Sequence, residues 1–125
     1  MEHNMVGWFE IPVTNMVRAK GFYEKVFKIT IEIHDLGGII MGWFPGVQGK
    51  TGASGSLVQH EMYTPSATDG PLIYFTCNDL SDEINRVEAA GGQILKPKIE
   101  IGGGHGFMGL IKDTEGNRIA LHSLK

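Results

Sequence analysis

Apolar and polar side chains alternate through residues 7–13, where Phe9, Ile11 and Val13 share one side. A period of two residues is typical of a strand with one buried face. After this strand Asn15 can cap a helix, and apolar side chains recur at helical spacing through residue 28. The pattern therefore predicts a strand followed by a helix of about three turns.

The remaining hydrophobic pattern predicts strands in the first half and a repeat of the same order in the second half. Strand-like segments follow the first helix at residues 28–33, 38–44 and 53–59. The second half then has a strand at 71–77, a helix at 79–90, and strands at 93–95, 107–112 and 117–123. A βαβββ unit is therefore predicted twice.

An offset of 64 residues relates the two units, because it places Asn15 on Asp79 and Gly52 on Gly116. We therefore expect one domain over residues 1–125, made of two modules. The first module covers about residues 5–60, a hydrophilic linker about 61–70, and the second module about 71–125. The polar turn at residues 113–117, with Gly116 in a left-handed conformation, is predicted to join the last two strands.

Composition narrows the classes of function. The chain has 125 residues and a formal net charge of -3, which offers no basic surface for nucleic acid. Its single cysteine, Cys77, cannot form an internal disulfide, and by parity it is expected as a small buried apolar residue. No apolar run is long enough to span a membrane, and the N-terminus has no pattern typical of a secretory signal. These features predict a cytoplasmic protein.

Several segments together resemble one known superfamily. They are Phe-Glu-Ile-Pro-Val at residues 9–13, Arg-Ala-Lys at 18–20, Phe-Tyr-Glu-Lys-Val-Phe at 22–27, Val-Glu-Ala-Ala-Gly-Gly at 87–92, Lys-Pro-Lys at 96–98 and Lys-Asp-Thr-Glu-Gly-Asn at 112–117. In this combination the chain resembles the vicinal oxygen chelate superfamily, which includes glyoxalases, bleomycin-resistance proteins and extradiol dioxygenases. The resemblance implies an α+β fold, in which two tandem βαβββ modules have curled mixed sheets that enclose a shared cavity, usually within a homodimer. Proteins with this fold catalyse several different reactions or only bind ligands, so the function has to be inferred from the residues of the site.

Strand parity indicates which side chains face that cavity. If Phe9, Ile11 and Val13 pack beneath the helix, Trp8 and Glu10 point to the opposite face. The equivalent strand of the second module turns Leu72, Tyr74 and Thr76 inward, and the last strands of the two modules turn inward Ser56, Val58, Ala120 and His122.

Metal-dependent relatives take one ligand from the first and the last strand of each module. The resemblance places those four positions at Trp8, Ser56, Leu72 and Ala120, none of which is a usual metal ligand. We therefore expect no metal cofactor, and with it no lactoylglutathione lyase activity.

The inward polar groups Glu10, Tyr74 and His122 are the candidate catalytic residues. A carboxylate, a phenol and an imidazole together can support proton abstraction from a small carbonyl compound. A solvated carboxylate at Glu10 and an ordinary hydrogen-bonded histidine at His122 are the plainer alternatives.

Aromatic side chains and one loop complete the candidate ligand-binding site. Trp8, Trp43 and Tyr74 could line a pocket for a flat or apolar ligand or simply fill the cavity. The glycine-rich segment 102–106 precedes a strand instead of a helix, so a hairpin loop is predicted there, with His105 as a candidate contact. The ligand-binding candidates are thus Trp8, Trp43, Ser56, Leu72, Thr76, His105 and Ala120.

Two functions remain open at this point. The first is a metal-independent, dimeric glyoxalase-like protein that binds a small organic molecule between its modules, with lyase or isomerase activity on a carbonyl substrate as its enzymatic version. The second is sequestration of a drug or metabolite, as in bleomycin-resistance proteins.

Overall fold

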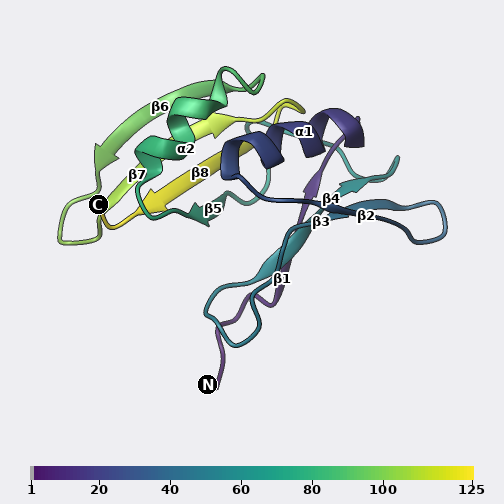
Figure 1. The fold of residues 1–125 in the computed structure, drawn as a ribbon, viewed down its shortest axis with the longest axis horizontal. Helices are drawn as coiled ribbons and strands as arrows, with labels where there is room; N and C mark the ends of the chain where they lie inside the picture. The colour runs from purple at the N-terminus through teal and green to yellow at the C-terminus, as the bar shows by residue number, and fades with distance from the viewer. Residues whose placement is uncertain (1) are drawn as a thin grey trace.

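The structure is a computed structural model that describes residues 2–125. The first module contains β1 (Trp8–Pro12), α1 (Met16–Phe27), β2 (Glu32–Asp35), β3 (Ile40–Trp43) and β4 (Ser54–Gln59). The second module contains β5 (Ile73–Thr76), α2 (Leu80–Val87), β6 (Gln93–Glu100), β7 (Phe107–Lys112) and β8 (Arg118–Ser123). The predicted βαβββ order is therefore present in both halves (Figure 1).

Each module folds its strands into one four-stranded mixed sheet. The first sheet has the order β1-β4-β3-β2 and the second has the order β5-β8-β7-β6. In each sheet the first strand pairs in parallel with the last, and the other neighbours are antiparallel. The two sheets therefore have the same topology, and they are referred to below as the first and second sheet.

The 64-residue offset relates the helix starts of the two modules, and it also relates their last strands, β4 and β8. Asn15 and Asp79 are the N-caps of α1 and α2, and their side chains accept hydrogen bonds from the backbone N–H groups of Arg18 and Ser81. Capping side chains of this kind satisfy backbone donors that the first turn leaves free. The predicted helix starts are confirmed.

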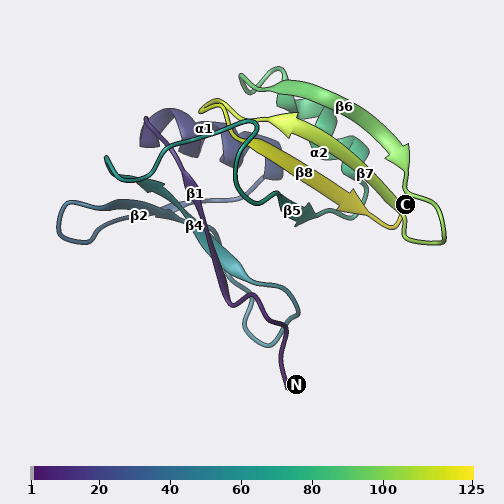
Figure 2. The same ribbon diagram turned by 180° about the vertical axis from the view of Figure 1, so that it is seen from behind.

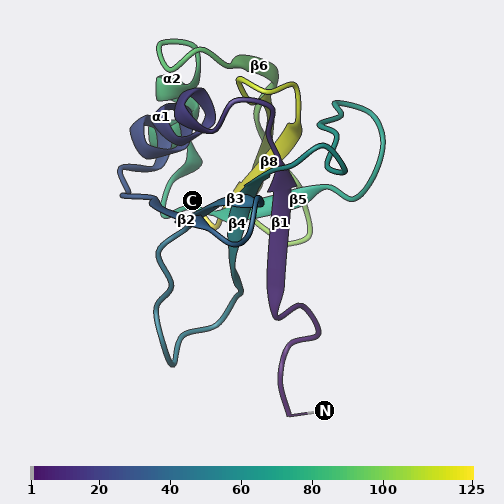
Figure 3. The same cartoon turned by 90° about the vertical axis from the view of Figure 1, so that its right-hand side faces the viewer.

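Helices and sheets form two layers. Figure 3 shows α1 and α2 together on one side and the strands of both sheets on the other. The apolar sets predicted to pack beneath the helices do so, since Ile11, Val13, Leu57, Ile119 and Leu121 all belong to the buried core. The opposite face of each sheet carries no helix, and this face is called the open face.

Three elements differ from the prediction by more than two residues at one end. The first difference is that Lys28 adopts a left-handed conformation (φ 57°) at the C-cap of α1, so that β2 begins only at Glu32. The second is that α2 ends at Val87 instead of residue 90. The third is that β6 continues through Pro97 to Glu100, because an edge strand can contain a residue without an N–H group. Register shifts on both sides of Lys96 accompany that proline.

The α+β class and the two tandem modules are confirmed, but one chain does not close the cavity. No strand of the first sheet pairs with a strand of the second among the described residues. Figures 1 and 2 show the first sheet extending toward the N-terminus while the second sheet runs in another direction. Within residues 2–125, neither helix has the length and apolar character that a membrane-spanning helix requires.

Candidate functional site

The open face of the first sheet gathers aromatic side chains around one carboxylate. Register places Glu10 opposite Ser56, and Ser56 opposite Trp43, so these side chains share that face. The rings of Trp8 and Trp43 meet edge to face with their centroids 6.1 Å apart. The predicted parity of this strand is confirmed, because Trp8 and Glu10 are exposed whereas Ile11 is buried.

Glu10 is held by two neutral donors from different parts of the chain. The indole Nε1–H of Trp8 donates to Glu10 Oε2 at 3.3 Å, and the hydroxyl of Tyr63 donates to Glu10 Oε1 at 3.0 Å. Tyr63 lies in the linker, which therefore folds back over β1. The hydrogen bond to the Glu10 carboxylate raises the pKa of Tyr63, so its proton stays on the phenol oxygen.

A histidine extends this group of rings. His34 from β2 lies against Trp43 with ring centroids 3.8 Å apart, and its Nε2 is 2.8 Å from Glu32 Oε1. Trp8, Trp43, Tyr63 and His34, together with Glu10, are called the aromatic face below. The indole Nε1–H of Trp43 is shielded from solvent and has no hydrogen-bond partner among the described residues.

The second sheet carries the other predicted residues. Tyr74 is 53% exposed and Thr76 is exposed, as parity predicted, while Ala120 is fully buried. The His122 ring Nε2 is 2.7 Å from the backbone carbonyl oxygen of His105, in the predicted hairpin loop between β6 and β7.

The three candidate catalytic residues are engaged separately within one chain. Glu10 contacts Trp8 and Tyr63, whereas His122 contacts the loop at His105. No hydrogen bond joins Glu10, Tyr74 and His122 in the part of the chain that the structure describes. Glu10 and His122 therefore do not form one hydrogen-bonded catalytic group in the described residues.

The four positions at which the resemblance implies metal ligands lack suitable donors here. The Trp8 indole donates to Glu10, and the Ser56 hydroxyl is fully buried and donates to the Leu57 carbonyl at 2.6 Å. Leu72 and Ala120 have no ligating side-chain atom. Across residues 2–125 no three His, Cys, Asp or Glu side chains are grouped to hold an ion. These residues do not fit the metal of the related enzymes.

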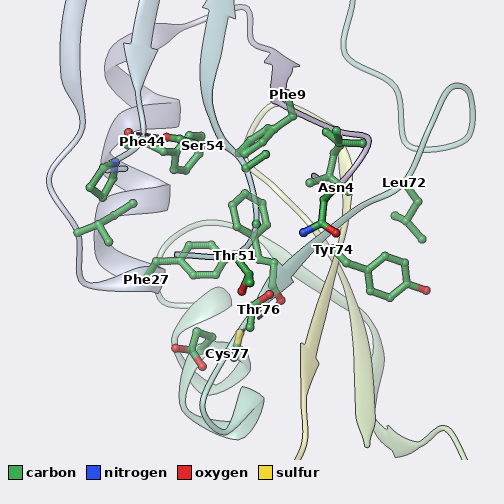
Figure 4. A pocket seen from close by; sticks show the side chains of 18 of the residues that line it. Asn4, Phe9, Phe27, Phe44, Thr51, Ser54, Leu72, Tyr74, Thr76 and Cys77 are labelled. Carbon is green, nitrogen blue, oxygen red and sulfur yellow. Dashed lines mark hydrogen bonds between the residues drawn. The ribbon is translucent and has the colours of Figure 1, made fainter. Parts of the chain in front are cut away.

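A pocket lies where the two modules meet (Figure 4). Its volume of about 780 Å³ is within the usual range for small-molecule sites, about 300–1,000 Å³. Three predicted site residues, Leu72, Tyr74 and Thr76, line it, and Figure 4 shows Leu72 and Tyr74 on the side opposite Phe9 and Phe27. This cavity is called the junction pocket.

Three residues of these sites, Tyr63, His34 and Glu83, were not predicted from the sequence. Glu83 lines the junction pocket. The position of His34 could have been predicted from the sequence, because His34 alternates with Glu32 on a strand and the next strand contains Trp43. The positions of Tyr63 and Glu83 could not have been predicted in this way. The path of the linker and the burial of a helical side chain depend on how the two modules pack.

Comparisons with known proteins agree with this fold. A family model described as Glyoxalase/Bleomycin resistance protein/Dioxygenase superfamily matches residues 5–121. A search of curated protein sequences gives no match.

Three solved structures illustrate the range of similar folds. The antibiotic binding protein TnmS3 from Streptomyces sp. CB03234 is 22% identical, with 98% of each chain covered and a TM-score of 0.70. A glyoxalase/bleomycin resistance protein from Albidiferax ferrireducens T118 is 14% identical, with coverage of 96% of this chain and 98% of that one, and a TM-score of 0.71. Glyoxalase I from Zea mays is 16% identical with a TM-score of 0.70; the match covers 94% of this chain but only 45% of the maize chain.

The duplicated βαβββ topology and the family match over residues 5–121 lead to one conclusion. The chain belongs to the glyoxalase/bleomycin resistance protein/dioxygenase superfamily.

Proposed function

We propose that this protein binds a small organic molecule on the aromatic face, without a metal, and sequesters it. The flat apolar part of the ligand stacks on Trp8 and Trp43, and a cationic or hydrogen-bond-donating group contacts Glu10. Such sites combine aromatic walls with a few placed polar groups.

The observation that carries this proposal is the environment of Glu10. Its carboxylate accepts hydrogen bonds from Trp8 and Tyr63, and it forms no ion pair among the described residues. The two neutral donors orient the carboxylate but leave its negative charge uncompensated. A ligand cation would supply the missing charge.

Sequestration is favoured over turnover by two findings. The candidate catalytic residues are not joined in one chain, and TnmS3, which covers nearly the same length, is an antibiotic binding protein. The enzymatic alternative requires Tyr74 and His122 of a second copy to reach Glu10. It predicts exchange of the α-protons of dihydroxyacetone in D₂O, observed by NMR, and sequestration predicts no exchange above the protein-free rate.

The binding experiment begins with a thermal-shift screen of aromatic cations, acids and neutral compounds. The best compound is then titrated by tryptophan fluorescence, because Trp8 and Trp43 belong to the proposed site. Glu10→Gln is expected to weaken binding at least tenfold, about 1.4 kcal/mol, while the protein still folds. The control Glu61→Gln removes an exposed carboxylate of the linker and is expected to leave the affinity unchanged. Equal affinities of the wild type and Glu10→Gln would remove Glu10 from the site.

A further inference from the structure

The junction pocket has an aromatic wall that is independent of the aromatic face. The Phe75 ring is 4.8 Å from Phe27, 5.5 Å from Phe44 and 5.7 Å from Phe9, measured between ring centroids. All four rings line the pocket, and three of them are only partly buried. Phenylalanine rings present negative π-faces, so such a wall attracts cations as well as apolar groups.

The charge of this pocket comes from one side chain. Glu83 on α2 is the only acidic residue that lines it, and no lysine or arginine lines it among the described residues. The Glu83 side chain is 17% exposed, and its Oε1 is shielded from solvent without a hydrogen-bond partner. An unpaired buried carboxylate oxygen is costly, so a ligand that donates to it gains affinity.

The nearest cation of the protein does not compensate Glu83 fully. Arg86 Nη2 is 3.7 Å from Glu83 Oε2, beyond hydrogen-bonding distance, and Arg86 Nε donates to the Val26 carbonyl at 2.8 Å. Arg86 Nε therefore serves the contact between α2 and α1, and no arginine or lysine of the described residues pairs with Oε1 of Glu83.

The thiol of Cys77, which also lines the junction pocket, does not add charge to it. Burial, reinforced by the negative charge of Glu83, raises the pKa of Cys77 to about 12. The thiol therefore stays neutral and protonated at physiological pH, so it adds no second negative charge.

We propose that the junction pocket is a second binding site, selective for organic ammonium ions, in which Glu83 accepts the ammonium group and the Phe9, Phe27, Phe44 and Phe75 rings hold the apolar part. This site goes beyond the binding function proposed for the aromatic face, because it shares no residue with that face.

The test compares three probes of nearly the same shape by isothermal titration calorimetry. They are 1-naphthylmethylammonium, neutral 1-naphthylmethanol and anionic 1-naphthylacetate. The titrations use the full chain in a Glu10→Gln background, so that the aromatic face does not contribute its charge. The ammonium probe is expected to bind at least about tenfold more tightly than the alcohol, and the acetate most weakly. Equal affinities for the three probes would overturn the proposal.

Two substitutions on α2 decide the role of Glu83. Glu83→Gln is expected to remove the preference for the ammonium probe. The adjacent Asp82→Asn, an exposed position with the same change of charge, is expected to retain it. If Glu83→Gln changes only the melting temperature and not the preference, Glu83 is a structural residue of the first helical turn and the proposal is wrong.

The location of the probe is measured separately by ¹H–¹⁵N NMR. Binding in the junction pocket is expected to shift the backbone signals of residues 75–78, with little change at the two tryptophan indole signals. Shifts confined to the indole signals would place the probe on the aromatic face, which would overturn this proposal and leave the first one intact.

Discussion

Glu115, in the turn between β7 and β8, connects the two modules at a single side chain. Its Oε1 accepts hydrogen bonds from the backbone N–H groups of Thr14 and Asn15, and its Oε2 is 2.6 Å from Arg18 Nε. Burial alone would raise the pKa of Glu115, but Arg18 and the two backbone donors outweigh it and lower the pKa to about 2. A carboxylate from the second module therefore holds the two residues that precede α1.

The first prediction concerns acid stability. Because the pKa of Glu115 is lower in the folded chain than its ordinary 4.5, its stabilisation is complete above about pH 4.5 and disappears as the pH falls toward 2. Glu115→Gln is expected to cost about 1–3 kcal/mol at pH 7, and this difference should shrink below pH 4.5. Urea denaturation at several pH values measures it, with Glu61→Gln as an exposed control. A difference that does not change with pH would contradict this account of Glu115.

The second prediction concerns metal content. Because Trp8, Ser56, Leu72 and Ala120 lack suitable donors, the purified protein is expected to contain far less than one Ni, Zn, Fe or Mn per chain. A chelator is likewise expected to leave the melting temperature unchanged. Elemental analysis that finds about one such ion per chain would show that the ligands come from other residues.

At the scale of elements, two glycines of the first module have opposite roles. Gly55 on β4 lies against β1, where an added methyl group would press on the Phe9 carbonyl oxygen and lie 2.5 Å from the Phe9 ring. Gly21 is exposed inside α1, and an added methyl group there would meet nothing within 4 Å.

The third prediction compares these two glycines. Gly55→Ala is expected to destabilise the chain by about 1–3 kcal/mol, because β1 must move away from β4. Gly21→Ala is expected to stabilise it by about 0.5–1 kcal/mol, because alanine favours the helix. Chemical denaturation of both variants measures the effects, and a loss of stability in Gly21→Ala would mean that α1 has contacts that the structure does not show.

Local chemistry made most elements predictable. The caps Asn15 and Asp79 fixed both helix starts, and alternation assigned the faces of β1 and β5. The largest error in extent was β6, which was predicted only over residues 93–95 although it continues through Pro97 at a sheet edge. Edge position is a property of the whole sheet, so a single segment does not reveal it.

At the scale of the molecule, the sequence predicted which sheet face each candidate site residue lies on, but not which residues it contacts. Parity placed Glu10 and Tyr74 correctly on open faces, yet Glu10 contacts Tyr63 of the linker instead of Tyr74. Which groups meet depends on how the two sheets are oriented, and that orientation is set by contacts such as Arg86 with the Val26 carbonyl. Contacts of this kind leave no periodic signal in the sequence.

The open faces and the free edges of the sheets favour association of two copies. Strands β1 and β5 are outer strands of their sheets, and β5 carries no charged residue that would protect it from pairing. Trp8 is 44% exposed and Tyr74 53% exposed on the same layer. A second copy would cover these rings and both edges at once.

The fourth prediction is therefore a homodimer. Sedimentation equilibrium at tens of micromolar is expected to give about twice the chain mass of 13.7 kDa. Tyr74→Lys adds a charge beside the free edge of β5 and should weaken the dimer. Val17→Lys, on the helix layer at 83% exposure, should leave it unchanged. A wild-type protein that sediments as a monomer would contradict the prediction, and a dimer sensitive only to Val17→Lys would place the interface on the helices instead of the sheets.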